Sequence, residues 1–276
     1  LFPNKSLNAF GKIQTQAFAS LLFAAIILLC FWVSVRTIFR QKHLSEMKND
    51  FINNITHEFK TPISTISLST EVLLNSNIVE DPVKLKNYAN IIKEENNRLK
   101  NQVDKVLQLA TLEKSKLKME NETIDLHQLI NNSIKSFDLI IKENKGLLTS
   151  HLEATHFMFF GDKIHITNTL HNLIDNAIKY AKKKPVISIS THNHKGYIII
   201  SVKDNGIGIP ATAQKHIFDK FYRTPTGNVH DIKGFGLGLN YVKTIVEAYD
   251  GIVELSSKEN EGSTFTIQLP EQSLRF

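Results

Sequence analysis

An uncharged apolar run near the start of the chain constrains its fold more than any other feature. Residues Ala17 to Val35 form nineteen positions without a formal charge, rich in Leu, Ile, Phe and Ala. At about 1.5 Å per residue, a helix of this length spans about 28 Å, close to the hydrocarbon thickness of a bilayer. The run therefore predicts a transmembrane helix, with Trp32 and Phe39 as interfacial aromatics near its far end.

A buried core helix and a signal peptide are the two alternatives for this run. A core helix rarely lacks polar residues on every face, and a signal peptide has a shorter apolar region before a small-residue cleavage site. Here Arg36 and Arg40 follow the run instead. Four basic residues from Arg36 to Lys48, against Lys5 and Lys12 before the run, place the long C-terminal portion in the cytoplasm by the positive-inside rule.

The composition is that of an ordinary globular protein with roughly two domains. The chain has 276 residues, of which 33 are basic and 27 acidic, and its net charge is +6. No long Lys/Arg run is present of the kind that follows a phosphodiester backbone, so we expect no nucleic-acid partner. The single cysteine, Cys30, lies inside the apolar run, and a cysteine-free remainder fits a reducing compartment.

The segment from Leu44 to Glu113 has a helical pattern that is interrupted near Asn75 to Asp81. Apolar residues recur every three or four positions from Ile52 to Leu73, and a heptad series runs from Leu85 to Ala110. The pair Asp81-Pro82 is a helix start signal. These helices predict an α-hairpin, which buries its seam by dimerising into a four-helix bundle. A passive coiled-coil stalk is the alternative.

A histidine on the outward face of the first helix argues against a passive stalk. His57 lies roughly 165° from the centre of the apolar stripe and is expected to point to solvent. Thr61, four residues on, shares that face, and Glu58 lies at its flank. Pro62 removes a helical hydrogen bond and is expected to bend the helix after this group.

From about Asp125 the pattern changes to short strands and helices in mixed order, which predicts an α/β sandwich. The pair His192-x-His194 precedes Gly196 in an expected hairpin turn, and we interpret it as a polar loop, with a metal-binding pair as the alternative. The expected strands are 147–152, 157–160, 186–191, 197–202, 252–256 and 264–269, and the expected helices are 126–143, 165–181 and 239–249.

The helix expected at 165–181 has a buried face and a polar face. Asn172, Asn176 and Lys179 lie opposite its apolar stripe. Amide oxygens are suitable ligands for Mg²⁺, and a lysine supplies positive charge, so this face suits a magnesium-bound polyphosphate. A solvated polar face is the alternative. Asp162, just upstream, is well placed to cap the helix.

Two glycine-rich segments follow. Asp204 to Pro210 (DNGIGIP) comes directly after an apolar strand, and its glycines permit a tight turn and close approach to a ligand. Asp204 can accept a hydrogen bond from an exocyclic amine such as that of adenine. Gly234 to Leu239 (GFGLGL) opens the next helix, where glycine amides form a natural phosphate cradle. Neither segment has the spacing of a Rossmann fingerprint.

Taken in order, these segments resemble the conserved boxes of bacterial sensor histidine kinases of two-component systems. The sequence HEFKTP at His57–Pro62 resembles the H box, and NLIDNAIKY at Asn172–Tyr180 resembles the N box. The two glycine segments resemble the two glycine boxes, and IFDKFYR at Ile217–Arg223 resembles the F box. The resemblance covers nearly all of the chain after the apolar run.

Together with the apolar run, the resemblance implies a membrane-anchored multidomain protein in a bacterial cytoplasmic membrane, with its catalytic domains in the cytoplasm. The expected parts are an extracytoplasmic remnant at 1–16 and a transmembrane helix at 17–38. A HisKA-type dimerisation and histidine phosphotransfer domain at 39–115 would form a dimeric four-helix bundle. A catalytic ATP-binding domain at 120–276 would be an α/β sandwich of the Bergerat type. The segment 113–123 is the expected hinge.

The resemblance also implies a role for each matching residue. His57 would be the phosphoacceptor, Glu58 the base that activates its ring, and Thr61 the residue that orients water for hydrolysis of a phospho-aspartate. Asn176 would bind Mg²⁺ with support from Asn172. The remaining implied nucleotide-binding residues are Lys179, Tyr180, Asp204, Gly206, Gly208, Gly234, Gly236 and Gly238, and the lid would span 224–233.

The implied reaction is ATP-dependent autophosphorylation of His57, followed by transfer to an aspartate of a response regulator receiver domain. Phosphatase activity on that regulator is also implied. The alternatives are another ATPase of this fold, such as a chaperone or gyrase-like enzyme, and a catalytically inactive membrane scaffold or phosphatase-only protein. The link from Arg36 to Lys48 is too short for a four-helix relay module, so the signal would pass along a continuous helix.

Overall fold

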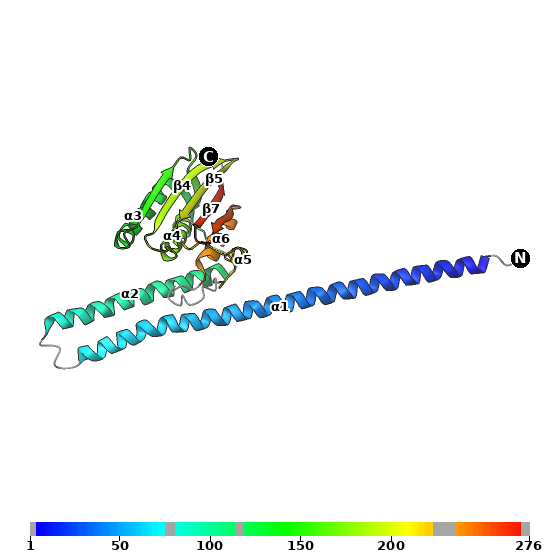
Figure 1. Cartoon of the computed structure of the whole chain (residues 1–276), viewed down its shortest axis with the longest axis horizontal. Helices are drawn as coiled ribbons and strands as arrows, with labels where there is room; N and C mark the ends of the chain where they lie inside the picture. Colours follow the sequence, from blue (N-terminus) through cyan, green and yellow to red (C-terminus); the bar gives the residue numbers. More distant parts are fainter. Residues whose placement is uncertain (1–3, 75–80, 114–118, 223–235, 272–276) are drawn as a thin grey trace. The chain divides into compact units, whose positions relative to one another are not determined.

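The computed structural model describes residues 4–74, 81–113, 119–222 and 236–271. The chain divides into two units, Leu1–Asn53 and Asn54–Phe276, and the boundary lies within one long helix. This helix, α1, spans Asn4–Leu74 (Figure 1). It continues through Pro62 without ending, and it confirms the expectation of a continuous helix between the apolar run and His57.

In the first unit, the apolar run of α1 is long and apolar enough to cross a membrane. It belongs to the one such helix in the described residues, with a mean hydropathy of 2.6 over its best window. Its large side chains are exposed, and Phe18 and Leu21 each expose 71% of their surface. Side chains of this kind would need lipid or another apolar partner to cover them.

In the second unit, the end of α1 and helix α2, Pro82–Glu113, make the predicted hairpin. Asp81 caps α2, because its Oδ1 accepts the backbone N–H of Lys84 at 3.1 Å and its carbonyl accepts that of Leu85 at 3.0 Å. The backbone N–H and the ammonium of Lys84 lower the pKa of the Asp81 carboxyl, and together they outweigh burial, which raises it. The start signal read from Asp81-Pro82 is thus confirmed.

The α/β part of this unit contains two sheets and four helices in its described residues. A two-stranded antiparallel sheet pairs β1 with β3, and a five-stranded sheet has the order β2-β4-β5-β7-β6, in which β2 and β4 are parallel and the other neighbours antiparallel. The strands are β1 Asn121–Asp125, β2 Leu147–Leu152, β3 Met158–Asp162, β4 Val186–His194, β5 Tyr197–Asp204, β6 Ile252–Lys258 and β7 Gly262–Pro270. The helices are α3 Leu126–Glu143, α4 Lys163–Lys179, α5 Ala211–Gln214 and α6 Gly238–Ala248.

The predicted strands and helices are confirmed with small shifts at their ends, while β1 and α5 were not predicted. Two interpretations were wrong. His192 and His194 lie in β4, not in a loop, and the turn follows at Lys195 and Gly196. The expected hinge extended too far, because residues 121–123 belong to β1. Residues 114–118 of that hinge lie outside the described part of the chain.

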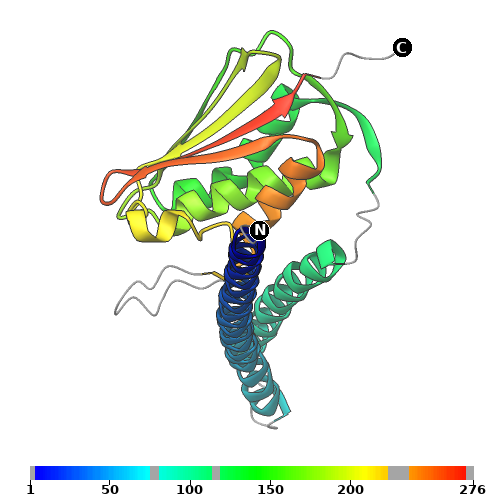
Figure 2. The ribbon, with the colours of Figure 1, turned by 90° about the vertical axis from the view of Figure 1, so that its right-hand side faces the viewer.

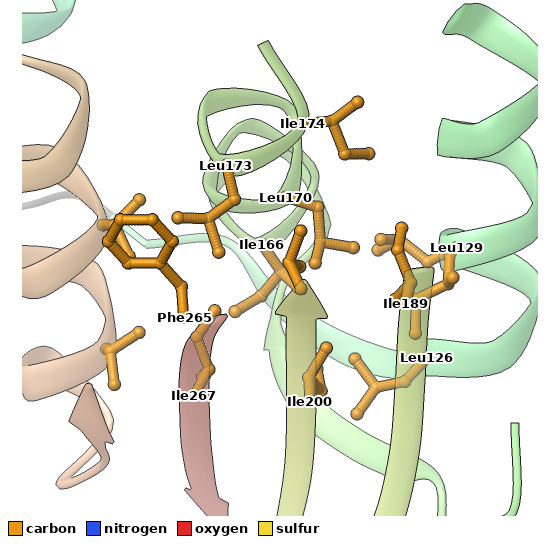
Figure 3. Packing of buried hydrophobic residues seen from close by; sticks show 14 of the residues in the cluster. Leu126, Leu129, Ile166, Leu170, Leu173, Ile174, Ile189, Ile200, Phe265 and Ile267 are labelled. Carbon is orange, nitrogen blue, oxygen red and sulfur yellow. The ribbon is translucent and has the colours of Figure 1, made fainter. Parts of the chain in front are cut away.

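The core lies between the five-stranded sheet and three helices, α3, α4 and α6, which cover one of its faces (Figure 2). Ile166, Leu170 and Leu173 of α4 point toward Ile200 and Ile267 of the central strands (Figure 3). All five of these side chains expose 2% or less of their surface. The spacing of three and four residues on α4 matches this single buried face.

A buried carboxylate joins the start of the α/β part to α4. Asp162 Oδ1 accepts the N–H groups of Ile164 and His165 at 2.9 and 3.0 Å, which confirms the predicted cap, and Oδ2 accepts that of Glu120 at 2.9 Å. Tyr249 Oη accepts the Asp162 N–H at 2.7 Å. Burial raises the pKa of Asp162, but the three N–H groups that donate to its carboxylate, together with the charge of His165, outweigh burial and hold the pKa below its usual value.

We expect Asp162→Asn to destabilise the fragment 119–276 by about 1–3 kcal/mol at pH 7, because one N–H donor would then face an amide N–H₂. Since the folded pKa of Asp162 is lowered, its stabilising contribution is present above the unfolded pKa and is lost as the pH falls through the folded pKa. The difference between wild type and variant should therefore shrink below about pH 4. Urea unfolding at several pH values measures this.

The exposed pair Asp138–Lys142 provides the matched control, since Asp138→Asn also converts a carboxylate to an amide. We expect that substitution to change the free energy of unfolding by less than about 0.5 kcal/mol. Equal effects of the two substitutions would contradict the role of Asp162.

Candidate functional site

The expected phosphoacceptor lies on the outside of α1. His57 is exposed, and its ring has no hydrogen-bond partner within the described part of the chain. Thr61 is also exposed, and its Oγ1 donates to the His57 carbonyl at 3.4 Å, one turn away on the same face. The outward orientation predicted for both residues is confirmed. An exposed imidazole can be approached by a separate domain or protein.

Glu58 has a different environment, although it is adjacent to His57. Its side chain exposes only 22% of its surface and reaches toward α2. There, Gln102 Nε2 donates to Glu58 Oε2 at 3.2 Å, and Arg98 Nη2 lies 3.7 Å from the same oxygen. No sequence motif indicated Arg98 or Gln102.

The polar face of α4 lies against the start of α6. Asn172 and Asn176 are half-buried. Asn172 Nδ2 donates to the Asn168 carbonyl at 2.8 Å, and a Cβ at Gly238 would lie 2.8 Å from Asn172 Oδ1. The expected N box and the second glycine box therefore meet here, and a side chain at position 238 would require the Asn172 amide to move.

Asp204 lies at the end of β5 and is 9% exposed. Its Oδ1 accepts the N–H groups of Gly206 at 2.7 Å and of Ser263 at 3.2 Å. Burial raises the pKa of this carboxyl, and the two N–H donors counteract only part of that rise. Oδ2 has no hydrogen-bond partner among the described residues. It is the oxygen that can accept a hydrogen bond from a ligand's amine.

Backbone hydrogen bonds tie the Asp204 loop to the end of α4. The Ile207 N–H donates to the Tyr180 carbonyl at 3.0 Å, and the Asn260 N–H donates to the Ile207 carbonyl at 2.7 Å. Lys182 Nζ also donates to the Asn260 carbonyl at 2.7 Å. Three segments that are far apart in sequence are therefore held together next to Asp204.

Tyr180 lies at this junction, and Lys179 is next to it. Lys179 Nζ lies over the Tyr180 ring at 5.5 Å from its centroid, a cation–π geometry. A Cβ at Gly206 would lie 2.7 Å from the Tyr180 carbonyl oxygen, so the close approach requires glycine there.

The second glycine box is only partly described. Gly236 has a φ of +68°, and a Cβ there would lie 2.8 Å from the Tyr222 carbonyl oxygen. Gly234 and the expected lid at 224–233 lie outside the described residues. Phe218 packs edge-on against Phe265 of the core with ring centroids 6.5 Å apart, which supports a structural role for this aromatic.

Sequence reasoning missed a serine pair beneath Asp204. Ser257 Oγ lies 2.9 Å from Ser263 Oγ and accepts the Ile209 N–H, also at 2.9 Å. Gln214 Nε2 donates to the carbonyls of Ile209 and Ser257 at 2.8 and 3.0 Å. These bonds support the loop that follows Asp204.

The donor set suits Mg²⁺ held mainly by a bound polyphosphate. Within the described ranges, no group of three His, Cys, Asp or Glu side chains could form a metal site of its own. Mg²⁺ is usually bound by one or two protein oxygens together with substrate phosphates and water. The half-buried amide of Asn176 carries an oxygen of this kind, and Lys179 follows one turn later.

Two glycines with positive φ allow a matched test of the Asp204 loop. Gly208 has a φ of +68°, and an added Cβ would collide with the Lys258 carbonyl oxygen. Gly196 has a φ of +79° with nothing within 4 Å. We expect Gly196→Ala to cost about 1–2 kcal/mol of stability from the strained φ and to leave nucleotide affinity unchanged.

We expect Gly208→Ala to cost more stability and to weaken nucleotide binding at least about tenfold, because the loop must shift away from Lys258. Thermal unfolding and calorimetric titration with a non-hydrolysable ATP analogue measure the two effects. Equal nucleotide affinity in the two variants would argue against a role for this loop.

Comparisons with known proteins agree with this geometry. Residues 47–115 match the family model of the His Kinase A (phospho-acceptor) domain, and residues 161–273 match that of the histidine kinase-, DNA gyrase B-, and HSP90-like ATPase. Sensor protein RprX of Bacteroides fragilis is 44% identical over 271 residues, which are 98% of this chain and 52% of RprX. The chain thus spans about half the length of this relative.

Solved structures show the same fold. The catalytic domain of histidine kinase ThkA matches with a TM-score of 0.50 at 25% identity, covering 56% of this chain and 100% of that domain. The complex of ThkA with the response regulator protein TrrA matches with a TM-score of 0.58 at 22% identity, covering 84% of this chain and 64% of the solved chain. With a phosphoacceptor domain followed by this ATPase domain, the chain belongs to the sensor histidine kinases of two-component systems.

Proposed function

We propose that the protein uses ATP to phosphorylate His57 and then passes the phosphoryl group to an aspartate of a response regulator. The observation that carries this proposal is the exposed His57 in a chain that also holds the buried Asp204, of which only one carboxylate oxygen accepts hydrogen bonds from the described residues. The first can be reached by a reacting phosphate, and the second has one oxygen available for adenine. The phosphoacceptor domain disfavours a chaperone or gyrase-like ATPase.

In this proposal, Asp204 Oδ2 accepts the adenine amine while Oδ1 remains bound to the loop. Asn172 lies against Gly238 and Tyr180 against Gly206, and Asn176 and Lys179 lie between Asn172 and Tyr180 in the sequence. Mg²⁺, when bound, would supply positive charge to the phosphate oxygens, with Asn176 as its protein ligand. The protein's contribution is mainly to position the reactants and neutralise charge.

In the transfer step, one ring nitrogen of His57 forms a bond to the γ-phosphorus. The bond between that phosphorus and the bridging oxygen breaks, and ADP leaves with the electron pair. Glu58 accepts a hydrogen bond from the N–H of the other ring nitrogen, which fixes the tautomer with its lone pair toward ATP. The phosphoryl group then moves to a carboxylate oxygen of the regulator, which leaves His57 neutral again.

The proposed partners are a response regulator, a second copy of the chain and the membrane, and each is supported by a separate observation. The solved ThkA chain is in complex with a response regulator protein, which supports a receiver domain as the acceptor here. The exposed apolar residues Ile52 and Ile63 support dimerisation of the hairpin into a four-helix bundle. The apolar run with Arg36 at its end supports insertion in the cytoplasmic membrane with the catalytic parts inside.

Incubation with γ-labelled ATP and Mg²⁺ tests the proposal directly. We expect acid-labile, alkali-stable label on the wild-type chain, no label on His57→Gln, and at least about 100-fold less on Asn176→Ala, because that variant lacks the expected Mg²⁺ ligand. Thr155→Ala, at an exposed position far along the sequence from either residue, serves as the control and should be labelled like the wild type.

Wild-type chain that binds ATP but acquires no label would favour the inactive scaffold or phosphatase-only alternatives. Label that persists in His57→Gln would assign the phosphoacceptor to another residue.

Removal of divalent cations tests the cofactor separately. We expect EDTA to abolish labelling and added Mg²⁺ to restore it, because the transfer needs a divalent cation to neutralise the negative charge on the triphosphate oxygens. Undiminished labelling in EDTA would contradict a Mg²⁺-dependent reaction.

A further inference from the structure

The carboxylate next to the phosphoacceptor is held by the second helix of the hairpin. Adjacent residues on a helix point about 100° apart, so His57 can face solvent while Glu58 faces α2. With 22% of its side chain exposed, Glu58 is largely removed from water and needs polar partners.

Two residues of α2 supply these partners to a single oxygen of the carboxylate. Gln102 Nε2 donates to Glu58 Oε2 at 3.2 Å, and Arg98 Nη2 lies 3.7 Å from it. Arg98 and Gln102 are four residues apart and therefore share one face of α2. Arg98 Nη1 also lies 3.5 Å from Glu95 Oε2, so the guanidinium is paired with a carboxylate on its own helix as well.

We infer that Arg98 and Gln102 are positioning residues for the phosphorylation of His57 and act through Glu58. This inference rests on the function proposed above. Both partners occupy Oε2, and Oε1 has no hydrogen-bond partner among the described residues. Oε1 is thus the oxygen left to accept the N–H of the imidazole.

Fixing the carboxylate in advance makes this contact easier to form. A glutamate side chain has several rotatable bonds, and ordering it costs conformational entropy when it is otherwise free. The cross-helix contacts order Glu58 before ATP arrives. A small misplacement of a catalytic group is enough to slow a reaction severalfold or more, so this ordering affects the rate.

A cation beside Glu58 is compatible with this role. The carboxylate orients the imidazole and balances the charge that develops on it, as the aspartate of a Ser-His-Asp triad does without taking the proton. As one ring nitrogen bonds to phosphorus and ADP leaves, the proton on the other nitrogen stays in its hydrogen bond to Glu58 until water removes it.

The test compares Arg98→Met and Gln102→Leu with wild type in the full chain, reconstituted as the dimer in lipid nanodiscs. We expect kcat for autophosphorylation to fall about tenfold in each variant while KM for ATP stays within about twofold, because neither residue belongs to the nucleotide-binding segments. Lys100→Met removes an exposed positive charge from the same helix and should leave both constants unchanged.

A double-mutant cycle separates positioning from a general structural effect. If Arg98 acts through Glu58, then Arg98→Met should add no further loss to Glu58→Gln. Arg98→Lys, which keeps a cation near Glu58, should recover part of the lost rate. Thermal unfolding of each variant shows whether the hairpin is still intact.

The outcomes are distinguishable. Labelled wild type, with Arg98→Met and Gln102→Leu equally fast or faster, would overturn this inference and leave the proposed function standing. Additive losses in the cycle would also overturn it, because Arg98 would then act independently of Glu58. An unlabelled wild-type chain would instead overturn the proposed function on which the inference rests.

Discussion

Burial of one face of α4 against the sheet determines where the proposed nucleotide-binding side chains lie. Ile166, Leu170 and Leu173 are at most 2% exposed, and burying each apolar side chain of this size stabilises the fold by about 1.5–3 kcal/mol. Rotating the helix by one residue would expose part of this face and bury Asn172 and Asn176 without partners. The apolar contacts thus orient the two amides, although they are made on the opposite side of the helix.

The loops around Asp204 depend on backbone contacts in the same way. The N–H groups of Ile207 and Asn260 and the tight approach at Gly206 hold the loop against Tyr180. A carboxylate at a loop would ordinarily have several orientations. Here two N–H donors fix Oδ1 of Asp204, so its second oxygen has a defined direction before a ligand binds.

The sequence predicted the elements that have strong periodicity or clear end signals. The bounds of α3 were predicted to the residue, and Asp81 and Asp162 were recognised as helix starts. Strand β1 was missed because Asn121–Asp125 is mostly polar and exposed, and its partner β3 is not adjacent in sequence. Helix α5 has only four residues, too few for a periodic pattern to be visible.

Residues of the candidate site could be proposed from the sequence where side-chain chemistry carries the signal, but not where backbone geometry or long-range contact carries it. Asp204 and Asn172 could be identified from motifs. The Ser263 N–H that supports Asp204 has no signature, because every residue except proline has such a group. Gln102 lies 44 positions from Glu58, and only the packing of the hairpin brings the two together.

His57 and Glu58 show how adjacent residues can meet opposite requirements. A phosphoacceptor that reacts first with ATP and then with a regulator has to be exposed, because two different partners must reach it. A carboxylate that assists it gains from being held still, which exposure prevents. The angle of about 100° between neighbouring helical residues allows both, provided that a second helix lies beside the first. In the proposed mechanism, the hairpin therefore contributes to the chemistry of His57 in addition to any part it has in dimerisation.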